Sequence, residues 1–245
     1  MPASDARLDQ SIVAEQRAWR SPESLDYYRR HRQGPNDLYR SERFFLPEVA
    51  ARVASMLDVG CAAGGFSAVV KTFNPTIRYV GVDVVPEFVD LARRDHPDAE
   101  FAVGDGVHFE TPPGSFELVH ASGVLHLNLR FRDLLRAMWA QTRRYLLCDL
   151  RLSPGQGGVG RMESPFGERD GVSLPYVVLN VEEALDLFRQ LDPQPDSVRV
   201  KGYRHPPSDA TTLVNSELIM AFFLAEKGSG AAKAEWDVDV DLDVR

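Results

Sequence analysis

The sequence predicts an α/β fold, in which helices cover both faces of a mostly parallel β-sheet. From residue 54 onwards, short apolar runs alternate with helical patterns, which is typical of parallel strands joined by crossover helices. A glycine-rich turn follows the first apolar run, as in folds that bind nucleotides. The last two strand-like runs have no helical pattern between them and should therefore pair antiparallel.

The expected strands and helices follow from the period of the apolar residues. Strands are expected near 55–59, 78–83, 99–103, 116–121 and 144–150, and helices near 64–73, 86–95 and 130–142. A glycine-rich loop over 153–171, a helix over 181–191 and the antiparallel strands 197–203 and 217–225 should follow.

Two additions flank the core, which we expect over residues 53–227. Residues 1–52 predict a helical addition in about three segments, the last running to about Arg52, which is either a packing layer or a lid. Residues 228–245 alternate acidic and aliphatic side chains after a Gly/Ser stretch. This pattern predicts a flexible acidic tail or, alternatively, an edge strand. An edge strand could also join the sheet of another subunit, so a homodimer is one alternative.

Composition excludes several classes of partner. The formal net charge is −8 and the basic residues are scattered, whereas a nucleic-acid partner requires a basic face. We find no apolar run of roughly 18 residues and no signal-peptide pattern. The two cysteines, Cys61 and Cys148, fall at the ends of expected buried strands, so a disulfide framework is not expected. A cytoplasmic protein without membrane or nucleic-acid partners is the resulting expectation.

The stretch from Ser55 to Ser67 reads as a strand, a glycine turn and a helix start. Asp83 follows Gly60 by 23 positions, at the end of the second strand. Glycines let a backbone approach a ligand closely, and such an acid accepts hydrogen bonds from ribose hydroxyls. The turn alone suits both a dinucleotide and S-adenosylmethionine.

Three features favour S-adenosylmethionine. Asp58 lies inside the first strand, where a buried acid needs a donor or a cation, and the ammonium of a methionine moiety supplies one. Asp105 ends the third strand, where an adenine amino group would reach it. The sequence ends in an antiparallel strand, where a dinucleotide-binding fold would have a second βαβαβ half.

Four ordered signatures make the sequence resemble the class I S-adenosylmethionine-dependent methyltransferases. They are Leu57–Gly65, Gly81–Asp83, Gly104–Asp105 and Phe116–His126, and the strand pattern extends the resemblance over about residues 40–225. The resemblance implies a Rossmann-like sheet of seven strands, the last antiparallel, with S-adenosylmethionine at the carboxyl ends of the strands. The cofactor-binding residues that it implies are Asp58, Gly60, Cys61, Ala62, Gly64, Asp83, Val84, Asp105, Gly106, His120 and Ala121.

The turn departs from the family at Ala62, which stands where the second glycine of G-C-G-x-G is usual. The added methyl group is tolerable if this residue keeps a negative φ, so we expect the cofactor to fit.

Methyl transfer to a hydroxyl group needs alignment and a base. His126 is the leading candidate base because an unperturbed imidazole has a pKa of roughly 6.5. For His120 a structural role is preferred. Asp149 and Arg151 share a face of the fifth strand. They form either a structural ion pair or a site in which Asp149 orients a substrate hydroxyl and Arg151 anchors an anionic group. Further candidate substrate contacts are Tyr28, His31 and Tyr203.

We therefore expect an enzyme that methylates a small molecule, preferably on an oxygen of a sugar, glycan or secondary metabolite. No metal site is expected, because the acids and histidines form no spaced carboxylate cluster. The alternatives are an NAD-dependent oxidoreductase and an S-adenosylmethionine-binding protein that does not methylate.

Overall fold

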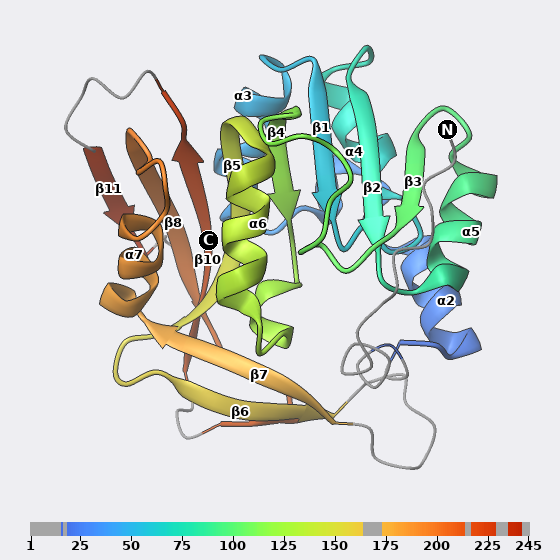
Figure 1. Ribbon diagram of the computed structural model, residues 1–245. Coiled ribbons are helices and arrows are strands. Elements are labelled where there is room, and N and C mark those ends of the chain that lie inside the picture. The colour runs from blue at the N-terminus through green and yellow to red at the C-terminus, as the bar shows by residue number, and fades with distance from the viewer. Residues whose placement is uncertain (1–15, 17–18, 164–172, 214–216, 229–234, 242–245) are drawn as a thin grey trace.

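The computed structural model describes residues 16, 19–163, 173–213, 217–228 and 235–241. Its centre is a twisted sheet with the strand order β11-β8-β10-β5-β4-β1-β2-β3 (Figure 1). The strands are β1 (Ser55–Val59), β2 (Arg78–Asp83), β3 (Glu100–Val103), β4 (Phe116–Ala121), β5 (Thr142–Ser153), β8 (Ser197–His205), β10 (Leu218–Glu226) and β11 (Glu235–Asp239).

The direction of the strands confirms the predicted fold class. Strands β1 to β5 are parallel to one another, and β10 is antiparallel to both of its neighbours, β5 and β8. Seven of these strands form the expected Rossmann-like sheet, and β11 is an eighth strand parallel to β8. The whole of β1 after Ser55 is buried, as a central parallel strand requires.

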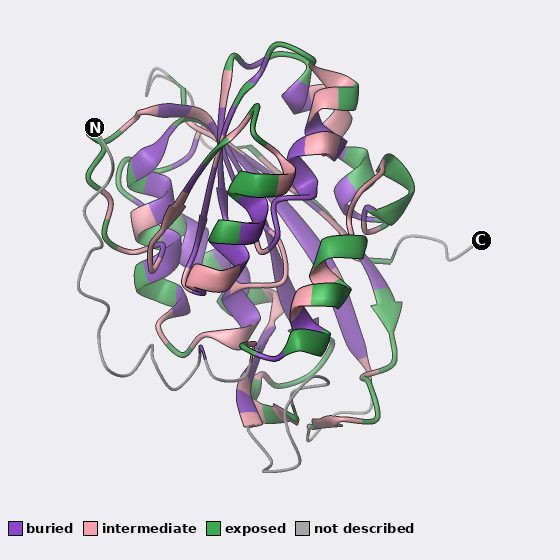
Figure 2. Cartoon of the chain, turned by 90° about the vertical axis from the view of Figure 1, so that its right-hand side faces the viewer, coloured by how far each residue is buried: buried purple, intermediate pink, exposed green. Residues whose placement is uncertain are grey.

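Helices cover both faces of the sheet. Helices α6 (Phe131–Gln141) and α7 (Val181–Arg189) lie on one face, in front of the sheet in Figure 1. Helices α3 (Leu46–Ala50), α4 (Phe66–Phe73) and α5 (Pro86–Asp95) contribute to a second apolar cluster on the other face. Figure 2 shows that the strands of the main sheet are mostly buried, while several of the helices have an exposed side. None of the helices in the described ranges is long and apolar enough to cross a membrane.

The predicted loop over 153–171 is partly wrong. Strand β6 (Gly158–Glu163) pairs antiparallel with β7 (Ser173–Asn180), and β6 also pairs with β9 (Thr211–Thr212). This small layer crosses the carboxyl ends of the main sheet (Figure 1) and joins it where β7 meets the end of β5. Strand β6 was not predicted because its residues Gly158 and Gly160 interrupt the apolar alternation that identifies a strand.

The flanking segments differ from the expectation in places. The tail was expected to be flexible, but its residues 235–239 form β11, which is the strand that its period-two pattern allowed. At the N-terminus, α2 (Pro22–Arg30) is present, but two 3₁₀ turns, η1 (Pro35–Asp37) and η2 (Glu42–Phe44), precede the short α3. A single helix to about Arg52 is therefore wrong. The first of the three expected helical segments, over residues 5–19, lies almost wholly outside the described residues.

Candidate functional site

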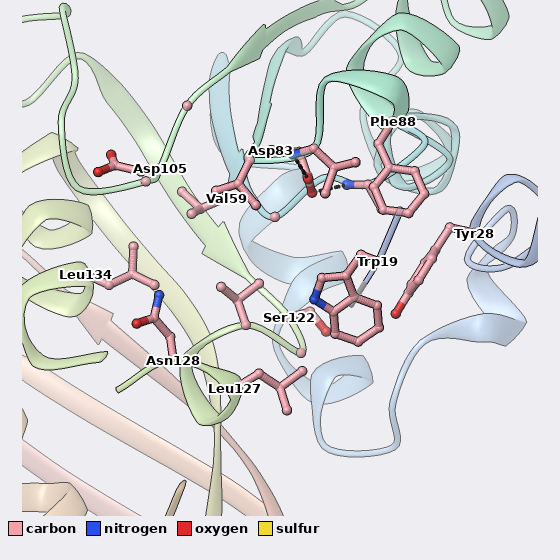
Figure 3. Close-up of a pocket in the computed structure, with 18 of the residues that line it drawn as sticks. Trp19, Tyr28, Val59, Asp83, Phe88, Asp105, Ser122, Leu127, Asn128 and Leu134 are labelled. Atoms are coloured by element: carbon pink, nitrogen blue, oxygen red, sulfur yellow. Dashed lines mark hydrogen bonds between the residues drawn. The ribbon is translucent and has the colours of Figure 1, made fainter. Parts of the chain in front are cut away.

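A cavity of about 210 Å³ opens at the carboxyl ends of the parallel strands. Its walls come from the segments that follow β1, β2, β3 and β4, and from the N-terminal segment around α2. Figure 3 shows the residues that line it, with Asp105 and Leu134 at one end and Trp19, Tyr28 and Phe88 at the other. The predicted site residues that line it are Tyr28, Gly60, Ala62, Asp83, Val84, Asp105 and Gly106.

The turn after β1 is folded tightly against β2. The backbone N–H groups of Gly60 and Cys61 both donate to the Val82 carbonyl, at 2.8 and 3.1 Å. Gly60 has φ = +78°, and a Cβ on it would lie 2.3 Å from Cγ2 of Val124. Only glycine suits this position.

Ala62 does not keep the negative φ on which the sequence argument depended. Its φ is +45°, in the left-handed region, where an L-residue with a Cβ is strained. Its N–H donates to Oδ2 of Asp83 at 2.9 Å, which ties the strained residue to the end of β2. The backbone therefore retains the conformation that a glycine would adopt, although the residue is alanine.

Asp83 joins the turn to the cavity. In addition to the bond from Ala62, its Oδ1 accepts the N–H of Val85 at 2.9 Å. Burial raises the pKa of Asp83 to about 6, although these N–H donors oppose the rise. A carboxylate has about four acceptor positions. Asp83 thus retains capacity for the ribose hydroxyls that the sequence assigned to it.

Asp105 lies across the cavity, after β3 (Figure 3). Its Oδ1 accepts the N–H groups of Val107 and His108, at 2.9 and 2.8 Å, and its Oδ2 lies 2.7 Å from Nδ1 of His108. Burial acts to raise the pKa of Asp105, but the bonds from His108 and Val107 outweigh it, so the pKa lies below its usual range. Asp105 is therefore an ionised acceptor at neutral pH.

Asp58 and His120 lie beneath the cavity instead of lining it. Asp58 faces His120 across the β1–β4 pair, with Oδ1 2.7 Å from Nδ1 of His120, and its Oδ2 accepts the hydroxyl of Tyr79. The buried acid has its partners within the protein, so the expected contact with a ligand ammonium is not needed to satisfy it. The other ring nitrogen of His120 lies 3.0 Å from Oε1 of Glu42.

The remaining predicted cofactor-binding residues pack in or around the glycine turn and are not part of the described lining of the cavity. Cys61 and Ala121 are buried, and neither belongs to the described lining of the cavity. Burial also raises the pKa of the Cys61 thiol well above its usual value, so the thiol stays protonated. A Cβ on Gly64 would meet Ala92 and Phe101 at 2.8 Å, so this glycine serves packing.

The predicted catalytic residues form a cluster behind the cavity wall. Asp149 accepts the N–H of Gly123, a lining residue, at 2.8 Å, and also pairs with Arg151. His126 is buried, packs edge-on against Tyr176, and is not a lining residue. Burial and then the charge of Arg151 hold the pKa of His126 well below 6.5. The assumption of an unperturbed imidazole was therefore wrong.

The predicted substrate contacts are spread over the molecule. Tyr28 lines the cavity, but Arg151, His31 and Tyr203 do not. His31 is exposed and stacks on Tyr27. The hydroxyl of Tyr203 lies 3.6 Å from Sδ of Met220 inside the core.

Sequence reasoning missed part of the site. Trp19 and Phe88 went unrecognised, and together with the predicted Tyr28 they form an aromatic wall, with ring centroids 5.9 Å apart for Trp19 and Tyr28 and 5.3 Å for Tyr28 and Phe88. Arg32, a lining residue, and Glu42, its partner, also went unrecognised. Arg32 ends a run of four basic side chains whose members the sequence does not distinguish.

Part of the chain is similar to known proteins. Residues 56–146, from β1 into β5, match the family described as a methyltransferase domain. Trans-aconitate 2-methyltransferase of Methylobacterium radiotolerans is 31% identical over 80 residues, which are 33% of this chain and 30% of that enzyme. The match thus spans less than a third of the relative's length.

Solved structures extend the likeness over most of the chain. Phosphoethanolamine N-methyltransferase 2 of Haemonchus contortus, in complex with S-adenosylhomocysteine, has a TM-score of 0.61 at 15% identity, covering 91% of this chain and 62% of that one. The N-terminal domain of EvdMO1, in the presence of S-adenosylhomocysteine and D-fucose, has a TM-score of 0.55 at 12% identity, covering 92% and 100%. Residues 56–146 are therefore similar to a methyltransferase domain, and the chain is confirmed to have the fold of the class I S-adenosylmethionine-dependent methyltransferases.

Proposed function

We propose that this protein transfers a methyl group from S-adenosylmethionine to an oxygen atom of a small molecule, such as a sugar, glycan or secondary metabolite. The observation that carries the proposal is the pair of carboxylates, Asp83 and Asp105, that lines one cavity beside a glycine turn. They come from the ends of β2 and β3, adjacent strands of the sheet. Ribose hydroxyls and an adenine amino group are donors that such carboxylates accept.

The residues present fit the cofactor. Gly60 and Gly106 have positive φ values of 78° and 72° and present no side chain to the cavity. The aromatic wall beside Asp83 supplies apolar surface for a nucleoside. When bound, S-adenosylmethionine supplies a methyl group on an activated leaving group, so the protein mainly has to align the acceptor.

Two relatives support a small acceptor with oxygen nucleophiles. One acts on trans-aconitate by name, and the other was crystallised in the presence of the sugar D-fucose. Both compounds are small and carry carboxylate or hydroxyl oxygens. A carboxylate is already an anionic nucleophile and needs no base, whereas a hydroxyl group needs one.

For a hydroxyl acceptor, we propose His126 as the base and Asp149 as a positioning residue. Nδ1 of His126 is buried and has no hydrogen-bond partner in the described ranges, and the imidazole is neutral. Asp149 acts through Gly123, whose N–H it holds at the edge of the cavity. Arg151 keeps Asp149 in place.

Asp83→Ala tests the proposal by calorimetric titration with S-adenosylhomocysteine. We expect the dissociation constant to rise at least about tenfold, because each hydrogen bond to a charged group contributes roughly 1.5–3 kcal/mol. Asp90→Ala is the matched control, since Asp90 lies on α5 with an exposed side chain and does not line the cavity.

Two results would contradict the proposal. Saturable binding of NADH without any response to S-adenosylhomocysteine would indicate an oxidoreductase. Tight binding of S-adenosylhomocysteine, with no methylated product from a broad panel of hydroxyl and carboxylate compounds, would indicate a protein that binds the cofactor without methylating.

A further inference from the structure

We propose that Arg32 is a carboxylate-binding group in the cavity, presented over the glycine turn by a buried chain of ion pairs. This inference rests on the proposed function, because the ligand is either the methionine end of the cofactor or a carboxylate of the acceptor. The two sources share one chemistry, and titration distinguishes them.

Only one of the two terminal nitrogen atoms of the Arg32 guanidinium group has a hydrogen-bond partner in the described residues. Nη2 donates to Oε1 of Glu42 at 2.7 Å, whereas Nη1 is buried without a hydrogen-bond partner in the described part of the chain. Arg32 lines the cavity, and its side chain is 24% exposed. A buried donor without a partner is unfavourable, and its presence in a native structure calls for an explanation, such as a bound ion. An anion in the cavity would supply that partner.

A buried chain of ion pairs, with alternating charges, holds Nη2 of the Arg32 guanidinium group in place. Glu42 is fully buried and contacts both Arg32 and His120. Burial acts to raise the pKa of Glu42, but Arg32 and His120 outweigh it and lower the pKa to about 2. His120 in turn contacts Asp58 in β1. Both carboxylates in this buried chain of ion pairs, those of Glu42 and Asp58, therefore have a cationic neighbour. The chain of ion pairs runs from the N-terminal segment into the sheet.

The backbone at Arg32 is held in an uncommon conformation. Its φ is +57°, which is rare for a residue with a side chain and persists only where the surroundings impose it. Here the guanidinium carbon lies 4.5 Å from the ring centroid of Phe66 and 5.4 Å from that of Tyr39. These contacts, together with the bond to Glu42, fix the direction of the free Nη1.

The segment that carries Arg32 rests directly on the glycine turn. A Cβ on Gly65 would lie 2.1 Å from Nε2 of Gln33 and 3.1 Å from the carbonyl oxygen of Arg32. Gly65 therefore makes room for the N-terminal segment, and Arg32 lines the same cavity as Gly60 and Ala62.

Charge and geometry make a carboxylate the matching ligand. Asp83 and Asp105 also line the cavity and would repel an anion, so an anionic group requires a nearby cation. A guanidinium group binds carboxylates through directional, charge-assisted hydrogen bonds. Arg130 is another cation in the lining and is the natural competitor for this role.

The first experiment compares S-adenosylhomocysteine with 5′-methylthioadenosine, which lacks the amino-acid end, by calorimetric titration. If the cofactor supplies the carboxylate, Arg32→Gln should weaken S-adenosylhomocysteine about tenfold or more and change 5′-methylthioadenosine by less than about twofold. Arg30→Gln, at an exposed position of α2, should change neither. Arg32→Lys should restore part of the affinity, because it restores the charge without the planar fork.

The second experiment titrates trans-aconitate into the protein saturated with S-adenosylhomocysteine. If the acceptor supplies the carboxylate, Arg32→Gln should abolish binding of trans-aconitate and leave both nucleosides unchanged. The proposal is overturned if Arg32→Gln alters neither titration, or if Arg130→Gln alone produces the selective loss.

Failure of the proposed function gives a different pattern. In that case the unmodified protein binds neither S-adenosylhomocysteine nor 5′-methylthioadenosine. Misfolding of Arg32→Gln is also recognisable, because it would weaken both nucleosides equally and lower the temperature of unfolding, and Arg32→Lys then carries the comparison.

Discussion

At the scale of single residues, the site combines residues that the motif locates with partners that the sequence does not reveal. Gly60, Asp83 and Asp105, which the sequence assigns to the cofactor, line the cavity because their place at strand ends follows from the motif itself. The contact of Asp58 with His120 was not foreseen, since it depends on the register between β1 and β4. No local pattern reports which buried groups meet across two strands.

Ala62 provides a prediction about strain. The left-handed region costs an L-residue roughly 1–2 kcal/mol, whereas replacing alanine by glycine costs about 0.4–1 kcal/mol through the unfolded chain. At φ = +45° the first effect is larger. Ala62→Gly should therefore raise the free energy of unfolding by about 0.5 kcal/mol, measured by urea denaturation.

Ala63→Gly is the control for this strain. Ala63 is buried and its φ is not positive, so the change should destabilise the protein by about 0.5–1 kcal/mol. Equal destabilisation by the two substitutions would show that Ala62 is not strained.

At the scale of elements, the N-terminal segment is connected to the sheet by buried charges. Helix α2 packs on α5 through Tyr28 and Phe88, while Glu42 in η2 contacts His120 at the end of β4. The sequence suggested a packing layer or a lid without indicating this connection. Hydrophobic period identifies helices and strands, but a buried ion pair between distant segments has no period.

Glu42→Gln tests that connection. The substitution keeps the shape of the side chain and removes the charge that Arg32 and His120 share. Removing one member of a buried ion pair typically destabilises a protein by about 3–5 kcal/mol. We expect a loss of about 3 kcal/mol in the free energy of unfolding, measured by chemical denaturation.

Glu48→Gln is the matched control, because Glu48 is only half-buried and pairs with Arg52 and Arg199 at the surface. Its effect should stay below about 0.5 kcal/mol. A loss that small for Glu42→Gln would mean that the buried chain does not stabilise the N-terminal segment.

At the scale of the whole molecule, the sheet was predictable and the small antiparallel layer was not. The core strands are central, buried and continuous, so their apolar runs identify them, and the missing helix before β10 identifies the antiparallel finish. Strand β6 is largely exposed and β9 is two residues long. The pairing of β6 with β7, and of β9 with β6, therefore leaves no hydrophobic pattern in the sequence.

The stability of the molecule should fall as the pH rises through the neutral range because of His120. Burial acts to lower its pKa, but Asp58 and Glu42 outweigh it and raise the pKa from 6.5 to about 9. A raised pKa stabilises the fold below the unfolded value and loses that effect as the pH rises through the folded value. Between pH 6.5 and 9, the loss should be on the order of 2 kcal/mol.

Urea denaturation of the unmodified protein and of His120→Gln measures this loss. The difference between their free energies of unfolding cancels the contribution of other titrating groups, such as the two cysteines. A difference that stays constant across this range would show that His120 is neutral in the folded protein.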